Sequence, residues 1–126
     1  MARIFLLVSS FLGFFSVALG AFGAHALKSR FDDYQMSVYH TGIQYQFFHS
    51  FALALVGLLI LKFGELGAYK LSGIAFVIGI ALFSGSLYLI AFTKIKTWGA
   101  VTPFGGLSLL LGWSALAWAI FQQKFE

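Results

Sequence analysis

The stretch LSGIAFVIGIALFSGSLYLIAF runs from Leu71 to Phe92 without one charged residue. As an α-helix rising about 1.5 Å per residue, it would be about 33 Å long. The hydrocarbon core of a bilayer is about 30 Å thick, so length and composition together indicate a helix that spans a membrane. Lipid is therefore the predicted environment of this segment.

Three further apolar runs accompany it, at residues 4–24, 42–62 and 104–121. The chain is 60% hydrophobic and 10% charged, whereas roughly a quarter of the residues in soluble domains are charged. The longest polar connection covers residues 25–41, which leaves no room for a soluble domain. We therefore expect one all-α domain over residues 1–126, an integral membrane four-helix bundle with short loops.

The first run also has features of a secretory signal, because Arg3 precedes the apolar stretch and Ala24-His25-Ala26 offers small residues for cleavage. The run is long for a signal peptide, so we expect a retained span.

Lysine and arginine do not fix the orientation of the four spans. Each side carries four of them: Arg3, Lys62, Lys70 and Lys124 with the termini, and Lys28, Arg30, Lys94 and Lys96 opposite. Asp32 and Asp33 make the opposite side slightly less favourable for the cytoplasm. We expect a plasma or inner membrane protein with both termini cytoplasmic. Trp98, Trp113 and Trp118 fit anchors at the membrane interfaces.

The second helix is predicted to begin near Asp33, outside the hydrocarbon, with Ser29 and Asp33 as candidate caps. Spacing of about 100° per residue places Thr41, Tyr45 and His49 on one stripe, and Gly42, Gln46 and Ser50 on the next. The opposite side carries Met36, Ile43, Phe47 and Phe51, which should face lipid. Polar groups within a membrane need partners, so Tyr45, Gln46 and His49 should bond inside the bundle.

A second polar feature interrupts the third span, where Ser84-Gly85-Ser86 and Tyr88 form a notch that could receive the Tyr45 and His49 stripe. Small residues also recur at four-residue spacing, which lets helices approach closely within one bundle or between two copies. The repeats are Ser9, Gly13 and Val17; Ser16, Gly20 and Ala24; Ala75 and Gly79; Ala81 and Gly85; Ser108 and Gly112. Pro103 suits the first turn of the last span.

Two interpretations of the polar residues remain open. In the first, their hydrogen bonds only fix which helices pack together. In the second, they contact a lipid headgroup, a quinone or another small amphiphile, since ionisable residues within a membrane often mark functional sites. The candidate ligand-binding residues are His25, Thr41, Tyr45, Gln46, His49, Ser84 and Tyr88.

The sequence gives little support for metal binding, catalysis or nucleic-acid binding. His40 and His49 lie nine residues apart, on opposite sides of one helix, and His25 with His40 makes only a loose ligand pair. We expect no metal, no cofactor and no catalytic residues, because no Ser, His and Asp grouping emerges and all four acids, Asp32, Asp33, Glu65 and Glu126, lie in loops or at the end. The chain has no cysteine, and its net charge of +4 forms no basic tract for nucleic acid.

Four motifs in chain order resemble the YgdD family of small bacterial membrane proteins, a domain of unknown function that includes transmembrane protein 256. The motifs are GAFGAHAL at 20–27, YQFFH at 45–49, FSGSLY at 83–88 and TPFGG at 102–106. In the family the second motif ends in alanine, where this chain has Ser50. The resemblance implies a four-helix inner or plasma membrane protein and brings no established reaction.

We therefore expect a structural or interaction protein that affects membrane integrity or a membrane partner. Its partners would be membrane lipids, another membrane protein or a second copy. The alternative is intramembrane binding or transport of a lipid, quinone or other small amphiphile.

Overall fold

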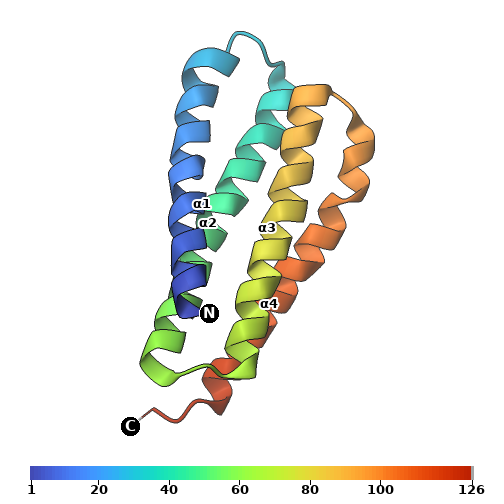
Figure 1. Cartoon of the computed structure of the whole chain (residues 1–126). Coiled ribbons are helices and arrows are strands. Elements are labelled where there is room, and N and C mark those ends of the chain that lie inside the picture. The colour runs from blue at the N-terminus through green and yellow to red at the C-terminus, as the bar shows by residue number, and fades with distance from the viewer. Residues whose placement is uncertain (126) are drawn as a thin grey trace.

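The computed structural model describes residues 1–125, which leaves the carboxylate of Glu126 outside the described part. Four long helices follow one another: α1 Ala2–Phe22, α2 Asp33–Phe63, α3 Gly67–Thr93 and α4 Thr102–Gln122. A π-helical turn, η1 Gly23–Leu27, extends α1, and a short 3-10 helix, η2 Lys96–Ala100, precedes α4. The described residues contain no strand, and the prediction of an all-α four-helix architecture is confirmed (Figure 1).

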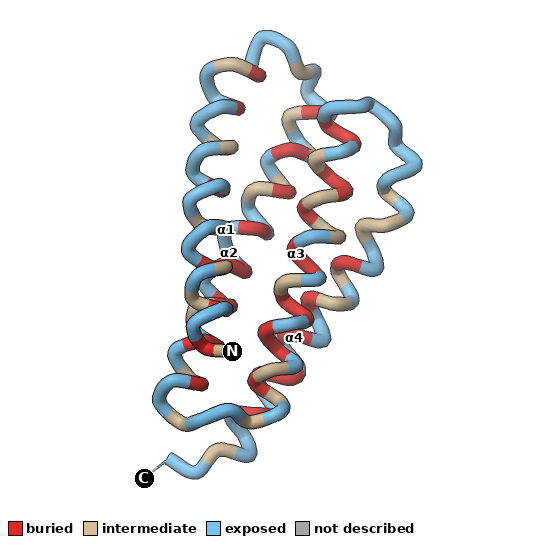
Figure 2. Tube along the Cα trace, viewed as in Figure 1, coloured by how far each residue is buried: buried red, intermediate tan, exposed pale blue. Residues whose placement is uncertain are grey.

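The helices run up and down, and each packs on the next in chain order. All four are long and apolar enough to cross a membrane. Burial is uneven, since 50% of the most apolar window of α3 is buried and only 17% of that of α1. The inner pair is therefore α2 and α3, with α1 and α4 on their flanks (Figure 2).

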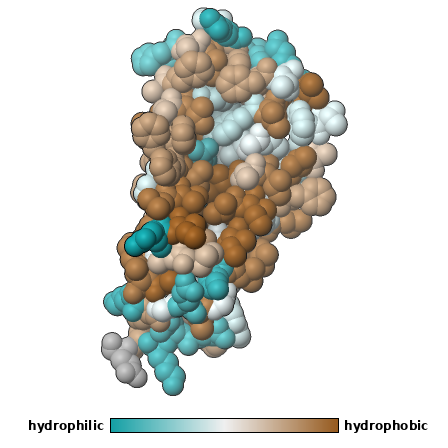
Figure 3. Space-filling model, viewed as in Figure 1, coloured by the Kyte–Doolittle hydropathy of each residue, from teal (hydrophilic) through white to brown (hydrophobic). Residues whose placement is uncertain are grey.

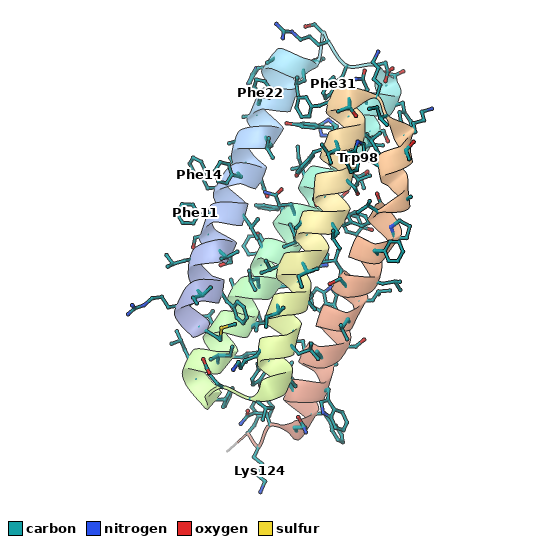
Figure 4. The ribbon with its side chains drawn as sticks, turned by 45° about the vertical axis from the view of Figure 1, so that its right-hand side comes forward. Phe11, Phe14, Phe22, Phe31, Trp98 and Lys124 are labelled. Carbon is teal, nitrogen blue, oxygen red and sulfur yellow. The ribbon has the colours of Figure 1, made fainter. Side chains whose placement is uncertain are left out.

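The outer faces of the helices are apolar, as a lipid environment requires. Figure 3 shows hydrophobic surface across the middle of the molecule and hydrophilic residues toward both ends. Phe11 and Phe14 project from α1 away from the other helices (Figure 4) and are 62% and 66% exposed. On α2, Phe47 and Phe51 are exposed as predicted, while Met36 and Ile43 are partly buried against Leu27 and Tyr39.

A capping box starts α2 at Asp33, the predicted place, but neither predicted cap forms it. Asp32 has extended backbone, its carboxylate accepts a hydrogen bond from the Gln35 N–H at 2.8 Å, and the Gln35 side chain accepts one from the Asp32 N–H at 3.0 Å. The reciprocal pair needs a side-chain oxygen acceptor three positions before a glutamate or glutamine. At this helix start only Asp32 meets that condition, whereas Ser29 lies in the preceding turn.

Small residues bring α3 and α4 together as predicted. Ser108 donates to the Ala75 carbonyl at 2.8 Å, and a Cβ added to Gly112 would lie 2.5 Å from the Phe76 ring. On α1 the prediction holds only in part, because Ser9 and Ser16 are buried, whereas Val17 is 64% exposed and a Cβ at Gly20 would meet open space. Since α1 packs chiefly on α2 and meets α3 near its start, where Phe5 lies against Gly73, several of its small residues are not needed for close approach.

The end of the molecule that carries the termini holds a small ionic cluster. The Met1 ammonium group donates to Glu65 at 2.8 Å, and Lys70 Nζ lies 3.9 Å from the same carboxylate. The hydrogen bond and the charge of the ammonium group hold the pKa of the exposed Glu65 carboxyl below its usual value.

Candidate functional site

Gln46 links three helices in the middle of the molecule. Its side-chain amide donates to the Leu12 carbonyl of α1 at 2.9 Å, and its side-chain carbonyl accepts from the Tyr88 hydroxyl of α3 at 2.7 Å. Gln46 is buried, and both ends of its amide are therefore satisfied by the protein itself, as an apolar surrounding requires.

Ser84 makes the next bond along the α2 and α3 contact. Its hydroxyl donates to the Gly42 carbonyl at 2.7 Å, and a Cβ at Gly42 would lie 2.7 Å from the Tyr88 ring. The notch in α3 thus receives Gly42 and Gln46, and not the Tyr45 and His49 stripe that the sequence predicted. The stripe that contains Gly42 and Gln46 faces α3, because Gly42 has no side chain and so leaves room for the Tyr88 ring.

His49 turns instead toward α4. The indole N–H of Trp113 donates to His49 Nε2 at 3.0 Å, so Nε2 carries no proton in this arrangement. The other ring nitrogen, Nδ1, lies 2.7 Å from the Tyr45 carbonyl and must carry the hydrogen that makes this bond. The pattern assigns a neutral imidazole with both nitrogens satisfied.

Trp113 was missed as a functional residue, because its sequence interpretation was an interface anchor. Its position near the middle of the apolar run at residues 104–121 was the available signal. An indole at that depth lacks the headgroups and water that interfacial tryptophans contact, so its N–H needs a partner inside the protein.

Tyr45 differs from its neighbours in the stripe. Its ring packs on Phe83, with ring centroids 4.4 Å apart, and the side chain is 39% exposed. Its hydroxyl makes no hydrogen bond within residues 1–125, so the expected bond inside the bundle is absent there. Because α3 presents an aromatic ring at this level, the phenol is turned outward.

A groove of about 620 Å³ opens beside this ring, between α2, α3 and α4. Tyr45, His49, Phe83 and Trp113 line its aromatic side, and Pro103 lies at its edge. The rest of the groove is apolar. The Tyr45 hydroxyl is therefore a hydrogen-bond donor with no protein partner beside an apolar surface.

The remaining two candidate residues lie apart from this groove. The Thr41 hydroxyl donates to the Ser37 carbonyl of its own helix at 3.0 Å, and His25 is exposed in η1. Over residues 1–125, no three His, Asp or Glu side chains gather in a way that could hold a metal ion. The seven predicted residues thus separate into the bonded set Gln46, Ser84 and Tyr88, the groove pair Tyr45 and His49, and the separate Thr41 and His25.

Comparison with known proteins decides the family. Residues 19–106 match the family described as "Protein of unknown function (DUF423)". The chain belongs to this family. The matched range contains all seven candidate residues, and DUF423 membership confirms the resemblance seen in the four motifs.

Relatives in several bacteria carry membrane names. The chain is 38% identical over 111 residues to the UPF0382 membrane protein YwdK of Bacillus subtilis, covering 88% of this chain and 90% of the relative. It is 39% identical over 116 residues to the UPF0382 inner membrane protein YgdD of Escherichia coli K12, covering 91% and 87%. A UPF0382 membrane protein of Haemophilus influenzae is 42% identical over 112 residues, with 89% of each chain covered.

These names and the four apolar helices establish an integral membrane protein. No solved structure shows a significant match to the chain.

Proposed function

We propose that the protein acts as a structural or interaction protein within the bilayer. The observation that carries this proposal is the closed hydrogen-bond network. Gln46, Ser84 and His49 each bond to protein groups on neighbouring helices, so these polar side chains serve the packing of the bundle. Polar groups that held a soluble substrate would present unpaired atoms to it.

Short connections support the same proposal. Only residues 64–66 join α2 to α3, and residues 28–32 separate η1 from α2. Little surface therefore lies outside the membrane, so contacts with a partner must form within the bilayer or among its headgroups. The proposed partners are membrane lipids, another membrane protein or a second copy of this chain.

The His49→Ala variant tests the proposal in mild detergent. Loss of the Trp113 bond should lower the thermal unfolding midpoint, while co-purified lipid stays at the wild-type level. The opposite result, an unchanged midpoint with loss of a bound molecule, would contradict the structural role of His49. His40→Ala is the matched control, because His40 is exposed on the same helix.

A second candidate function rests on Tyr45. Its hydroxyl lacks a protein partner beside the groove lined by Phe83 and Trp113, which favours an amphiphile with a carbonyl or ester oxygen for the phenol to contact. Tyr45→Phe removes only the hydroxyl. If the groove holds such a molecule, native mass spectrometry should show its retention fall in Tyr45→Phe with no change in thermal stability. Equal retention in both proteins would remove this candidate.

For the orientation, we propose that both termini face the cytoplasm. Lysine and arginine are balanced, and so are the acids, with Asp32 and Asp33 at the opposite end and Glu65 and Glu126 on the side of the termini, so this proposal is decided by experiment. Alkaline phosphatase fused after the last residue should be inactive, and a fluorescent protein at the same site should be bright. The reverse pattern would place the termini outside.

A further inference from the structure

A long groove follows the contact between α1 and α2 on the lipid-facing side. It has a volume of about 590 Å³, with Gly13 and Ser50 at its floor and the rings of Phe14, Phe47 and Phe51 along its walls. The aromatic rings on both sides and the absence of a side chain at Gly13 leave a groove that is open to lipid. It lies on a different face from the Tyr45 groove, with which it shares no lining residue.

The interior of this groove offers hydrocarbon contacts and no free donor. The hydroxyls of Ser9 and Ser10 both donate to the Leu6 carbonyl at 2.8 Å, and that of Ser50 donates to the Phe47 carbonyl at 2.6 Å. Each serine is thereby satisfied within its own helix. A polar ligand would find no partner here, whereas an acyl chain would need none.

The positively charged side chain of Arg3 lies where the groove approaches the end of the molecule that carries the termini. Ser10 lines both the groove and a second recess of about 390 Å³, which is bounded by Arg3, Leu6 and Leu61. Within residues 1–125, Arg3 has no carboxylate partner, since the ion pairs at this end join Glu65 to Met1 and Lys70. The guanidinium is therefore available for an anion among the headgroups.

The distance from Arg3 to the far end of the groove matches the thickness of one lipid leaflet. From Arg3 to Ala18, at the far end of the groove, α1 rises about 22 Å at its usual rise per residue. Half of a bilayer, headgroups included, is about 20 to 22 Å thick. A phosphate beside Arg3 would thus allow an acyl chain to follow the groove toward the centre of the membrane.

We propose that this groove binds one anionic phospholipid, with its phosphate at the Arg3 guanidinium and an acyl chain between Phe14 and Phe51. Guanidinium groups bind phosphate oxygens through paired N–H donors, which supplies the headgroup contact. Exchange of the anionic headgroup for a zwitterionic one should weaken retention about fivefold, the usual effect of one basic residue near a charged surface.

The first test fills the groove. A Cβ at Gly13 would meet only Ser50 Oγ at 3.9 Å, so a side chain can start from this position, and Gly13→Leu is chosen to fill the floor of the groove. Gly20→Leu is the matched control, because a Cβ there meets open space and Gly20 does not line the groove. Native mass spectrometry with added phosphatidylglycerol should show the bound lipid lost in Gly13→Leu and kept in Gly20→Leu.

The second test removes the cation. Arg3→Gln should make retention of phosphatidylglycerol equal to that of phosphatidylcholine with the same acyl chains, whereas wild type should prefer the former about fivefold. Lys124→Gln is the control, since Lys124 lies in the C-terminal tail away from the groove (Figure 4) and should keep the preference. Circular dichroism checks that each variant stays helical.

Three results would overturn the proposal. Wild type could retain both lipids equally, Gly13→Leu could keep phosphatidylglycerol, or Gly13→Leu could convert a dimer to a monomer without lipid loss. The last result would show that a second copy of the chain occupies the groove.

Discussion

Tyr69 is buried in the core with no exposed surface, and its hydroxyl has no partner within residues 1–125. An unpaired buried polar group costs about 1 to 3 kcal/mol. Tyr69→Phe should therefore raise the free energy of unfolding by about 1 kcal/mol, measured by reversible unfolding in detergent. Tyr39→Phe is the comparison, because the Tyr39 hydroxyl donates to the Leu19 carbonyl, and its loss should destabilise. Destabilisation of both variants alike would mean that a water satisfies Tyr69.

Gln46 provides a second prediction at this scale. Gln46→Leu removes the bonds to Leu12 and Tyr88, and hydrogen bonds between membrane helices average about 0.6 kcal/mol. The free energy of unfolding should fall by roughly 1 kcal/mol or more, because the Tyr88 hydroxyl loses its acceptor. Gln44→Leu, an exposed glutamine two residues away, should change it little. Equal stability of Gln46→Leu and wild type would show that the network contributes nothing.

Helical spacing in the sequence could find Gln46, Ser84 and His49 as residues that need partners, and the structure gives each one a partner. It could not name those partners. Whether Tyr88 meets Gln46 or Tyr45 depends on the rotation of α3 about its axis, which is set by the space at Gly42. The bond from Trp113 to His49 joins residues 64 apart in the chain, so spacing within one helix carried no information about it.

At the scale of single helices, the apolar runs predicted four long helices, because the helix length that a bilayer requires is set by its thickness. The predicted start of α2 near Asp33 is also confirmed. The π-helical turn at Gly23–Leu27 was not foreseen. It lies at a tertiary contact, since a Cβ at Gly23 would lie 2.5 Å from the Tyr39 ring of α2.

The α2 cap can be tested directly. Asp32→Ala removes the carboxylate that accepts from the Gln35 N–H, and loss of such a cap usually costs about 1 kcal/mol. The thermal unfolding midpoint should fall in Asp32→Ala and stay unchanged in Ser29→Ala, because Ser29 bonds to no backbone group at this helix start. A larger effect of Ser29→Ala than of Asp32→Ala would show that Ser29, as first predicted, caps the helix.

The helices form a row in chain order, with further contacts between α1 and α3 at Phe5 and Gly73 and between α2 and α4 at His49 and Trp113. No hydrogen bond or aromatic contact joins α1 to α4 within the described chain, and every hydrogen bond between its helices involves α2 or α3. The sequence predicted a bundle but not this openness, because hydropathy reports contact with lipid or protein and not which helices are neighbours. The openness leaves α1 with one packed face and a broad aromatic face toward lipid.

Absence of native cysteine makes this arrangement testable by crosslinking. A Cβ at Gly13 would lie 3.9 Å from Ser50 Oγ, so side chains at these two positions meet across the contact between α1 and α2, as a disulfide between them requires. The double variant Gly13→Cys with Ser50→Cys should oxidise within one chain to a crosslinked monomer, detected by its mass and faster gel migration. Gly13→Cys with Leu111→Cys, which pairs α1 with the exposed face of α4, should stay reduced under the same conditions. Crosslinking of the second pair would require α1 and α4 to be neighbours and would close the row into a ring of four helices.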